Sequence, residues 1–184
     1  MKHPSNQEFF GYWDRKRGTA RAPDRADIEP AALRELLGDI FVLAYDTQAG
    51  FPFRVAGTRV SALLGRDLKN EGFAGLFAGE SCRDVEDLVG GVVEDVLPAV
   101  AGVTALTADG SPAHLELLLL PFVARAHSPV SLTGLLAPFD SAPAPIRDLT
   151  LTSWRYLHPP ETFVPRVIRK LAIARGFMVY EGLR

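Results

Sequence analysis

The chain has 184 residues, of which 47% are hydrophobic and 23% are charged, with a formal net charge of −2. This length suits one domain with extensions, and the composition allows a packed core. No apolar run approaches the ~18 residues that a membrane span needs, and residues 1–12 lack a signal-peptide layout, so we expect a cytoplasmic protein. The single cysteine, Cys82, cannot form an internal disulfide, and the few Cys and His residues argue against a structural zinc site.

A helix is expected near the N-terminus, over residues 5–17. Ser5 and Glu8 have the spacing of a capping box, in which each side chain satisfies an orphan amide of the first turn. Four aromatic residues occupy about half of this helix: Phe9, Phe10, Tyr12 and Trp13. So many rings need cover, either from an open face of the domain itself or from a second copy of the chain. We expect a homodimer, formed through Phe9, Phe10 and Trp13.

A short helix and a β-hairpin are expected next. Residues 27–38 are predicted to form the helix, with Pro30 at a first helical position and Gly38 at its end. Residues 40–45 are apolar and rich in β-branched and aromatic side chains, which is typical of a strand covered on both faces. After a turn, residues 51–56 return as the second strand.

The stretch 53–65, FRVAGTRVSALLG, joins this hairpin to the helical part of the chain. Gly57 and Thr58 are expected to form the turn, with Thr58 as the helix cap. Gly65 is expected to end the helix. A strand that turns directly into a short helix can form the wall of a cavity. The glycines within residues 66–79 indicate short turns.

The clearest helix is predicted over residues 84–97, with Ser81 as its cap. Its apolar residues recur at helical spacing: Val85, Leu88, Val89, Val92, Val93 and Val96. The opposite face is acidic and solvated. Gly90 and Gly91 lie in the middle, where each costs about 1 kcal/mol of helix propensity, and they indicate a kink or a close contact.

Three further strands are predicted, over residues 99–108, 113–124 and 130–137. Asp109 and Gly110 form a tight-turn signal between the first two. With the two earlier strands, they predict an α+β fold, namely a five-stranded antiparallel sheet with helices on one face.

The C-terminal part differs from the rest in charge. Residues 38–140 contain six Lys and Arg against thirteen Asp and Glu, whereas residues 141–184 contain seven against three. The basic segment either docks on its own domain or reaches an acidic partner, and we expect docking because it is also rich in apolar side chains. Residues 149–157 are expected to be extended, and residues 163–175 to form an amphipathic basic helix.

The predicted elements divide the chain into three regions. Residues 1–26 form an N-terminal helix and linker, residues 27–140 form the compact core, and residues 141–184 form a basic C-terminal extension. A segment of Ser, Ala and Pro at 141–145 marks the end of the core.

The order of elements resembles a PAS domain, in particular the bacterial PAS-like family that begins with a Trp-bearing helix. The segments that carry the resemblance are YWDRKRG, APDRADIEP, LLGDIFVLAYD and FRVAGT. The resemblance covers residues 9–140 and implies a PAS-like sensory or regulatory domain. It also implies a cavity between the sheet and the helices over residues 58–97, and signalling through helices that flank the core. Most members of this family have no assigned ligand, so the resemblance implies a role rather than a chemistry.

Arg54, Thr58 and Arg59 are the candidate ligand contacts at the strand-to-helix turn. A guanidinium there can bind a carboxylate or a phosphate in the cavity through two parallel hydrogen bonds. The alternative is an ion pair on the surface with Asp67 or Glu71, because Arg is usually exposed or paired.

His114 and Glu116 alternate with leucines, so both point to one face of a strand. One interpretation is a ligand-binding or proton-handling pair, since His titrates near neutral pH. The alternative is the polar end of a solvated strand face, because Glu is almost never buried unpaired.

The sequence identifies no cofactor, and flavin, haem and a metal site are not expected. Cys82 precedes Arg83, as in flavin-binding light sensors of the PAS class, but the Asn and Gln that would bind the flavin are missing. Residues 58–97 contain no His that could ligate haem. No nucleophile elbow or phosphate-binding loop is present in a suitable context.

We therefore expect a non-enzymatic sensory or regulatory module in signal transduction, which binds a small molecule or a signalling protein. One alternative is a small α+β enzyme that uses His114 and Glu116 as an acid–base pair. Another is an interaction scaffold whose cavity is filled by Leu and Phe. Neither a membrane nor a nucleic acid is expected as a partner.

Overall fold

The computed structural model describes residues 1–123, 131–140 and 145–157 with their side chains, and residues 169–174 and 177–181 by their backbone. Within these ranges, no helix is both long enough and apolar enough to cross a membrane.

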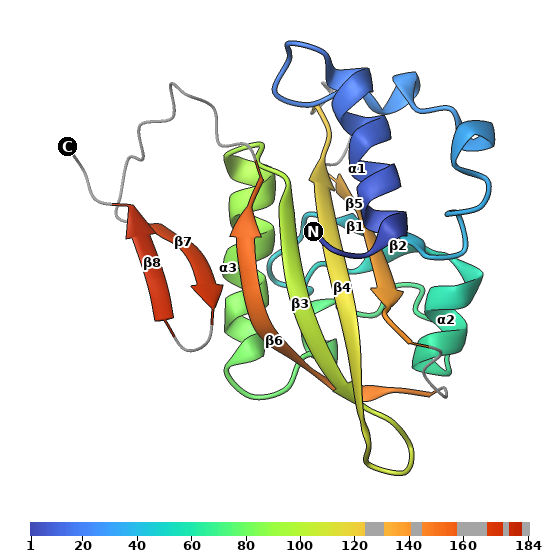
Figure 1. Ribbon diagram of the computed structural model, residues 1–184, viewed down its shortest axis with the longest axis vertical. Coiled ribbons are helices and arrows are strands. Elements are labelled where there is room, and N and C mark those ends of the chain that lie inside the picture. The colour runs from blue at the N-terminus through green and yellow to red at the C-terminus, as the bar shows by residue number, and fades with distance from the viewer. Residues whose placement is uncertain (124–130, 141–144, 158–168, 175–176, 182–184) are drawn as a thin grey trace.

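An antiparallel sheet organises the molecule (Figure 1). Its strands are β1 (Ile40–Ala44), β2 (Phe53–Ala56), β3 (Ala99–Leu106), β4 (Pro112–Pro121), β5 (Ser131–Pro138), β6 (Arg147–Tyr156), β7 (Arg169–Ala174) and β8 (Phe177–Glu181). They lie in the order β2-β1-β5-β4-β3-β6-β7-β8. The first five positions are the five expected strands. The expected strand number was too low because the chain after residue 145 pairs with the edge of this core.

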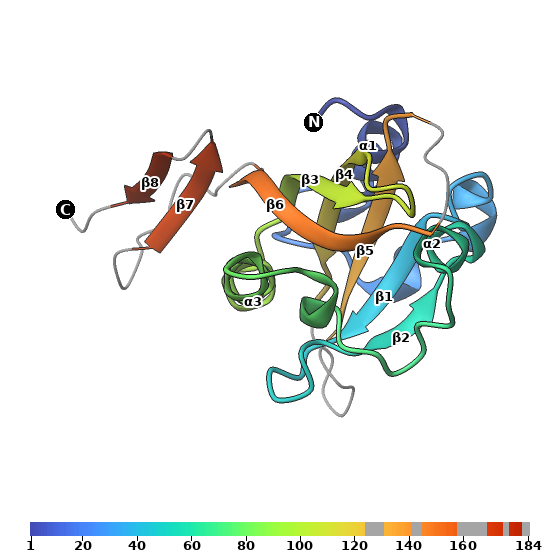
Figure 2. The same cartoon turned by 90° about the horizontal axis from the view of Figure 1, so that it is seen from below.

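Helices cover both faces of the sheet, and Figure 2 shows α1 and α3 on opposite sides. The helices are α1 (Pro4–Arg17), α2 (Thr58–Leu64) and α3 (Ser81–Glu94), with 3-10 turns at Arg25–Asp27, Pro30–Leu33 and Ala74–Leu76. α2 and α3 pack on what we call the inner face, and α1 packs on the outer face. The α+β architecture with the core helices on one face is confirmed, and α1 covers the other face.

The inner face is filled by aromatic and aliphatic side chains. Phe41, Phe53 and Phe73 are each at most 1% exposed, with ring centroids 5.3 to 5.7 Å apart. The Phe41 ring lies over Gly134 of β5, where a Cβ would overlap the ring. Apolar residues of α2 and α3 complete the same cluster. The space in which a ligand cavity was expected therefore holds the protein's own side chains.

The aromatic side chains of α1 pack on the outer face of their own sheet. Phe9 and Trp13 are each 1% exposed, and Phe10 and Tyr12 are each 9% exposed. Trp13 Nε1 donates a hydrogen bond to the Pro121 carbonyl oxygen at 2.9 Å. The sequence left two possibilities for covering these rings, a face of the domain itself or a second copy of the chain. In the structure, the domain's own sheet covers them. A homodimer stays a prediction, but Phe9, Phe10 and Trp13 cannot form its contact while α1 is docked.

A close backbone approach shapes the strand-to-helix turn. Gly57 is the N-cap residue of α2, and a Cβ on it would overlap the Gly38 carbonyl group. The same carbonyl oxygen accepts hydrogen bonds from the Arg59 amide at 2.9 Å and the Val60 amide at 3.1 Å. Thr58 is therefore not the cap that the sequence predicts, because a distant backbone carbonyl satisfies the first turn of α2.

The segment before β1 forms 3-10 helices and turns, whereas an α-helix was predicted over residues 27–38. Its backbone groups bind other elements: the Glu29 amide donates to the Tyr12 hydroxyl at 2.9 Å, and the Gly38 carbonyl binds the start of α2. These contacts replace the regular hydrogen bonds of a longer helix.

Two further helix caps differ from prediction. The cap of α1 is His3, whose Nδ1 accepts from the Ser5 amide at 3.2 Å, and not the expected capping box. Ser81 is the first residue of α3, and its hydroxyl accepts from the Leu151 amide of β6 at 3.1 Å. The Ser81 hydroxyl thus binds an amide that is distant in the sequence, and not an amide in the first turn of its own helix.

β6 belongs to the packed core. It pairs with β3 along nearly its whole length, and its Leu149 and Trp154 join the inner cluster. Residues 147–156 thus dock on their own domain, as expected for part of the basic extension. The packed core continues beyond the expected boundary at residue 140.

The helix predicted over residues 163–175 is wrong for its second half. Residues 169–174 form β7, whose backbone pairs with Ser153, Trp154 and Arg155 of β6. An available strand edge overrides the helical spacing of the apolar residues. Residues 163–168 lie outside the described residues.

Gly90 and Gly91 of α3 provide a matched test of the packing between α3 and β6. A Cβ on Gly91 would overlap the Tyr156 hydroxyl, whereas a Cβ on Gly90 meets no neighbouring atom. We expect Gly91→Ala to lower the free energy of unfolding by about 1–3 kcal/mol through overpacking. Gly90→Ala should raise it by up to about 1 kcal/mol through helix propensity. Denaturant unfolding followed by circular dichroism measures both changes.

The double variant Gly91→Ala/Tyr156→Phe is the control for this contact. Removal of the hydroxyl should recover part of the stability that Gly91→Ala loses. Equal effects of the two alanine substitutions would contradict the close approach of Tyr156 to α3.

Candidate functional site

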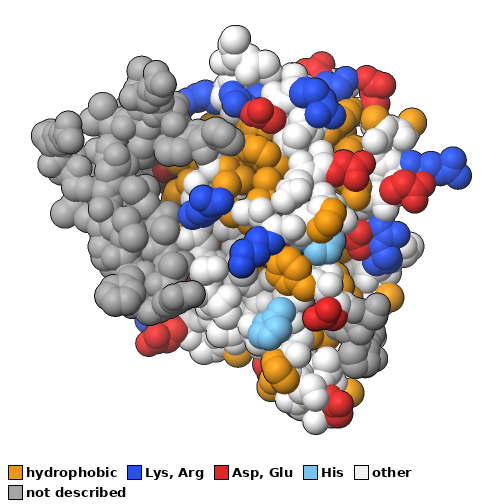
Figure 3. Space-filling model, in the orientation of Figure 1, with side chains coloured by type: hydrophobic (Ala, Val, Ile, Leu, Met, Phe, Trp, Pro, Cys, Tyr) orange, Lys and Arg blue, Asp and Glu red, His pale blue; other side chains and the backbone are white. Residues whose placement is uncertain are grey.

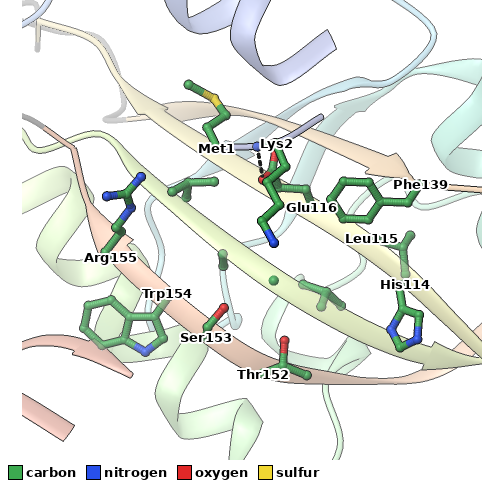
Figure 4. A pocket seen from close by; sticks show the side chains of 14 residues that line it. Met1, Lys2, His114, Leu115, Glu116, Phe139, Thr152, Ser153, Trp154 and Arg155 are labelled. Carbon is green, nitrogen blue, oxygen red and sulfur yellow. Dashed lines mark hydrogen bonds between the residues drawn. The ribbon is translucent and has the colours of Figure 1, made fainter. Parts of the chain in front are cut away.

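A hollow of about 470 Å³ lies on the outer face, over β3, β4 and β6 and beside the start of α1 (Figure 4). Ligand sites commonly measure about 300–1,000 Å³, so the hollow has the size of a small-molecule site. Its polar and charged lining includes Lys2, His114, Glu116, Thr152, Ser153 and Arg155. These side chains come from the N-terminal segment, from β4 and from β6.

The hollow exists because α1 leaves part of the outer face uncovered and because one residue of β3 there is a glycine. α1 packs mainly over β4 and β5, and Val100 is the β3 residue that joins its cluster. On β3, Gly102 has no side chain, and a Cβ there would lie 2.8 Å from Thr152 Oγ1 and 3.0 Å from Ser153 Oγ. The register between β3 and β6 shifts next to Gly102. A bare stretch of backbone bordered by two hydroxyl groups therefore forms the floor.

Glu116 is a buried carboxylate in the wall of the hollow, and it is 5% exposed. Its Oε1 accepts from the Lys2 amide at 2.7 Å, while its Oε2 accepts from the His3 amide at 2.9 Å and from Asn6 Nδ2 at 3.0 Å. A buried charge is tolerated when such donors satisfy it. The alternative of a solvated strand face is thus wrong for Glu116. Its carboxylate instead anchors the start of α1.

His114 lies two residues away on the same face of β4, and it is exposed. Its Nδ1 is 3.2 Å from Thr104 Oγ1 of β3. Within the described residues, no hydrogen bond joins His114 to Glu116, whose oxygens already bind three N–H groups. Strand alternation thus places both residues at one hollow, where their side chains bind separate partners.

Two basic side chains that sequence analysis did not single out also line the hollow. Lys2 precedes α1 and Arg155 lies on β6, and both are exposed. Neither side chain makes a hydrogen bond or an ion pair within the part of the chain that the structure describes. Figure 3 shows Lys, Arg and His side chains gathered near the centre of this face. No local pattern signals these residues, because only the sheet brings positions 2 and 155 together.

The three residues expected to bind a ligand at the strand-to-helix turn do not line this hollow. Arg54 lies on β2, and Thr58 and Arg59 lie in the first turn of α2. All three are exposed, and none of them lines the hollow. Arg59 forms a bidentate ion pair with Asp39, with Nε–Oδ1 and Nη2–Oδ2 distances of 2.7 Å. The hydrogen bonds to Asp39 raise the pKa of Arg59. The ion-pair alternative is therefore correct for Arg59, although its partner is Asp39 and not either of the carboxylates considered from the sequence.

No metal-binding group is present among the residues that the structure describes: no three or more His, Cys, Asp or Glu side chains gather there. Cys82 is a free thiol of intermediate burial. It packs against the inner cluster, on the opposite side of the sheet from the hollow. Cys82 therefore has a packing role in this fold.

The profile of the PAS domain family matches residues 1–137. The chain belongs to the PAS domain family. The match includes α1 and ends at the close of β5, so β6 lies beyond it. The resemblance found in the sequence is confirmed, and PAS domains generally serve as sensory, non-enzymatic modules. No curated protein matches this chain significantly.

Several solved structures are similar in fold. The LOV protein of Rhodobacter sphaeroides is 14% identical, with a TM-score of 0.44 over 55% of this chain and 59% of that protein. The light state of the blue-light photoreceptor Aureochrome1 LOV is 13% identical, with a TM-score of 0.45 over 60% of this chain and 88% of that one. The PAS domain of an HTR-like protein from Haloarcula marismortui is 18% identical, with a TM-score of 0.43 over 59% of this chain and 90% of that one.

Glu116→Ala tests the anchor of α1. The change removes the acceptor of the Lys2 and His3 amides and one of the two acceptors of Asn6 Nδ2, which also donates to the Glu116 backbone carbonyl. We therefore expect the free energy of unfolding to fall by about 1–3 kcal/mol. Amides of α1 should also exchange faster with solvent, because the start of the helix is released. Chemical denaturation and hydrogen exchange followed by mass spectrometry measure the two effects.

Glu86→Ala is the matched control, because Glu86 is exposed on α3. It should change neither the stability nor the exchange of α1 appreciably. Unchanged exchange of α1 in Glu116→Ala would show that the carboxylate does not hold this helix.

Proposed function

We propose that this PAS domain is a non-enzymatic sensory or regulatory module that binds a small molecule in the outer-face hollow. The proposal rests on one observation: the same side chain lines the hollow and holds the start of α1. Glu116 lines the hollow, and the same carboxylate binds the backbone of Lys2 and His3 at the start of α1. A ligand that touches this wall has different contacts when α1 is docked and when it is displaced, and it therefore shifts the equilibrium between the two states.

The position of α1 suits it to transmit such a shift. It covers apolar residues of β4 and β5, including Leu118, Leu120 and Leu135. Displacement of α1 would expose this apolar surface, and a signalling protein could bind it. The proposed output is thus a change in how firmly α1 covers the outer face.

The geometry gives less support to a small enzyme. Glu116 already accepts three hydrogen bonds, and the Nδ1 of His114 lies beside a threonine hydroxyl. Both oxygens of Glu116 are thus engaged by the protein itself, whereas a general base has to reach a proton of the substrate.

A pure interaction scaffold is the second candidate, and the filled inner face favours it. Leu37 and Val55 are 43% and 59% exposed, so apolar side chains are available for a protein contact near β2. In a scaffold, the outer hollow would have no resident ligand.

Native mass spectrometry after mild purification tests the proposed function. The wild-type protein should carry a bound small molecule. Gly102→Val should lose it, because the added side chain occupies the floor between Thr152 and Ser153. Thr150→Val is the matched control, since Thr150 is exposed on β6 outside the hollow, and it should retain the molecule.

Two results would contradict the proposal. One is a bound molecule that Gly102→Val retains in full. The other is a wild-type protein that carries no molecule and shows no rise in melting temperature with a metabolite extract, which would favour the scaffold.

A further inference from the structure

The charges around the outer-face hollow are unbalanced. Lys2, His114 and Arg155 contribute basic groups, whereas Glu116 is the one acidic residue among the described lining. The charge of Glu116 is engaged by three N–H donors on the protein side of the wall. The hollow therefore presents two permanent cations and an imidazole without a carboxylate that is free to pair with them.

The basic groups line the hollow from the N-terminal segment, from β4 and from β6. Figure 4 shows the Lys2 side chain extending over the hollow, with its ammonium group between Arg155 and His114. The hydroxyl groups of Thr152 and Ser153 lie on the opposite border, where they can donate hydrogen bonds. Cationic side chains and hydroxyl donors are groups that bind carboxylates and phosphates in proteins.

The remaining lining is apolar. Met1, Val100 and Phe139 contribute to the walls. Phe139 is 44% exposed, and its ring meets the His3 ring edge-on at 5.7 Å between centroids. An exposed ring beside the hollow can cover an apolar part of a ligand. A bare inorganic ion would leave these walls without contacts.

We propose that the hollow selects a small organic anion, namely a carboxylate or a phosphate on a compact apolar body. The anionic group lies between Lys2 and Arg155, within reach of the Ser153 hydroxyl, and the apolar body lies toward Phe139. This inference rests on the proposed function and names the chemical class of its ligand.

Three probes of similar size separate charge from shape. Benzoate carries a carboxylate, phenyl phosphate carries a phosphate, and benzamide is a neutral analogue of benzoate. Isothermal titration calorimetry measures affinity, and the amide NMR signals of Gly102 and Ser153 report whether the hollow is occupied. We expect at least one anion to bind about tenfold or more tightly than benzamide, a difference of about 1.4 kcal/mol.

Charge reversal on the two cations tests their roles. Lys2→Glu and Arg155→Glu should each lower the affinity for the anion by about tenfold or more, because a repulsive charge replaces an attractive one. Lys69→Glu and Arg83→Glu are matched controls, since both residues are exposed and lie outside the hollow. The controls should retain most of the affinity.

Each outcome decides the inference. A preference for benzoate or for phenyl phosphate supports it and identifies the anionic group. Binding of benzamide as tight as that of both anions overturns the anion selectivity while the small-molecule function stands. Failure of both anions to move the Gly102 and Ser153 signals overturns the inference, and so does an equal loss of affinity in the control variants.

Discussion

The fold depends on the burial of β4 from both sides. Leu115, Leu117 and Leu119 face the inner cluster, while Leu118 and Leu120 face α1. A strand in the middle of a sheet that is apolar on both faces needs cover on both, because exposed apolar surface of this extent is unfavourable in water. α2 and α3 cover one face, and α1 has to cover the other. The position of α1 is thus fixed by the composition of β4.

The same strand explains where the hollow lies. At Glu116 the outer face of β4 changes from apolar to polar, and there the cover by α1 ends. The carboxylate holds the chain just before α1, and the neighbouring strand contributes Gly102 without a side chain. One buried charge therefore ends the apolar packing and also forms the wall of the candidate site.

The strand-to-helix turn at residues 53–65 has a structural role in this chain. Gly57 allows the Gly38 carbonyl to approach and bind the first amides of α2, and Arg59 pairs with Asp39 nearby. The turn thereby fastens α2 over a filled aromatic cluster. In this member of the PAS domain family, a hydrophobic cluster fills the inner face of the described core, and the hollow of about 470 Å³ lies on the outer face.

Local patterns in the sequence determined much of this protein: the 3.6-residue spacing of α3, the strands β1 to β5, and the common face of His114 and Glu116. These depend on neighbours along the chain, so spacing suffices to predict them. Tertiary structure alone decided the docking of α1, the addition of β6 and β7, the capping of α2 by Gly38 and the meeting of Lys2 with Arg155. Each of these pairs a group with a partner far away in the sequence, and no local spacing encodes which distant edge, carbonyl or charge becomes that partner.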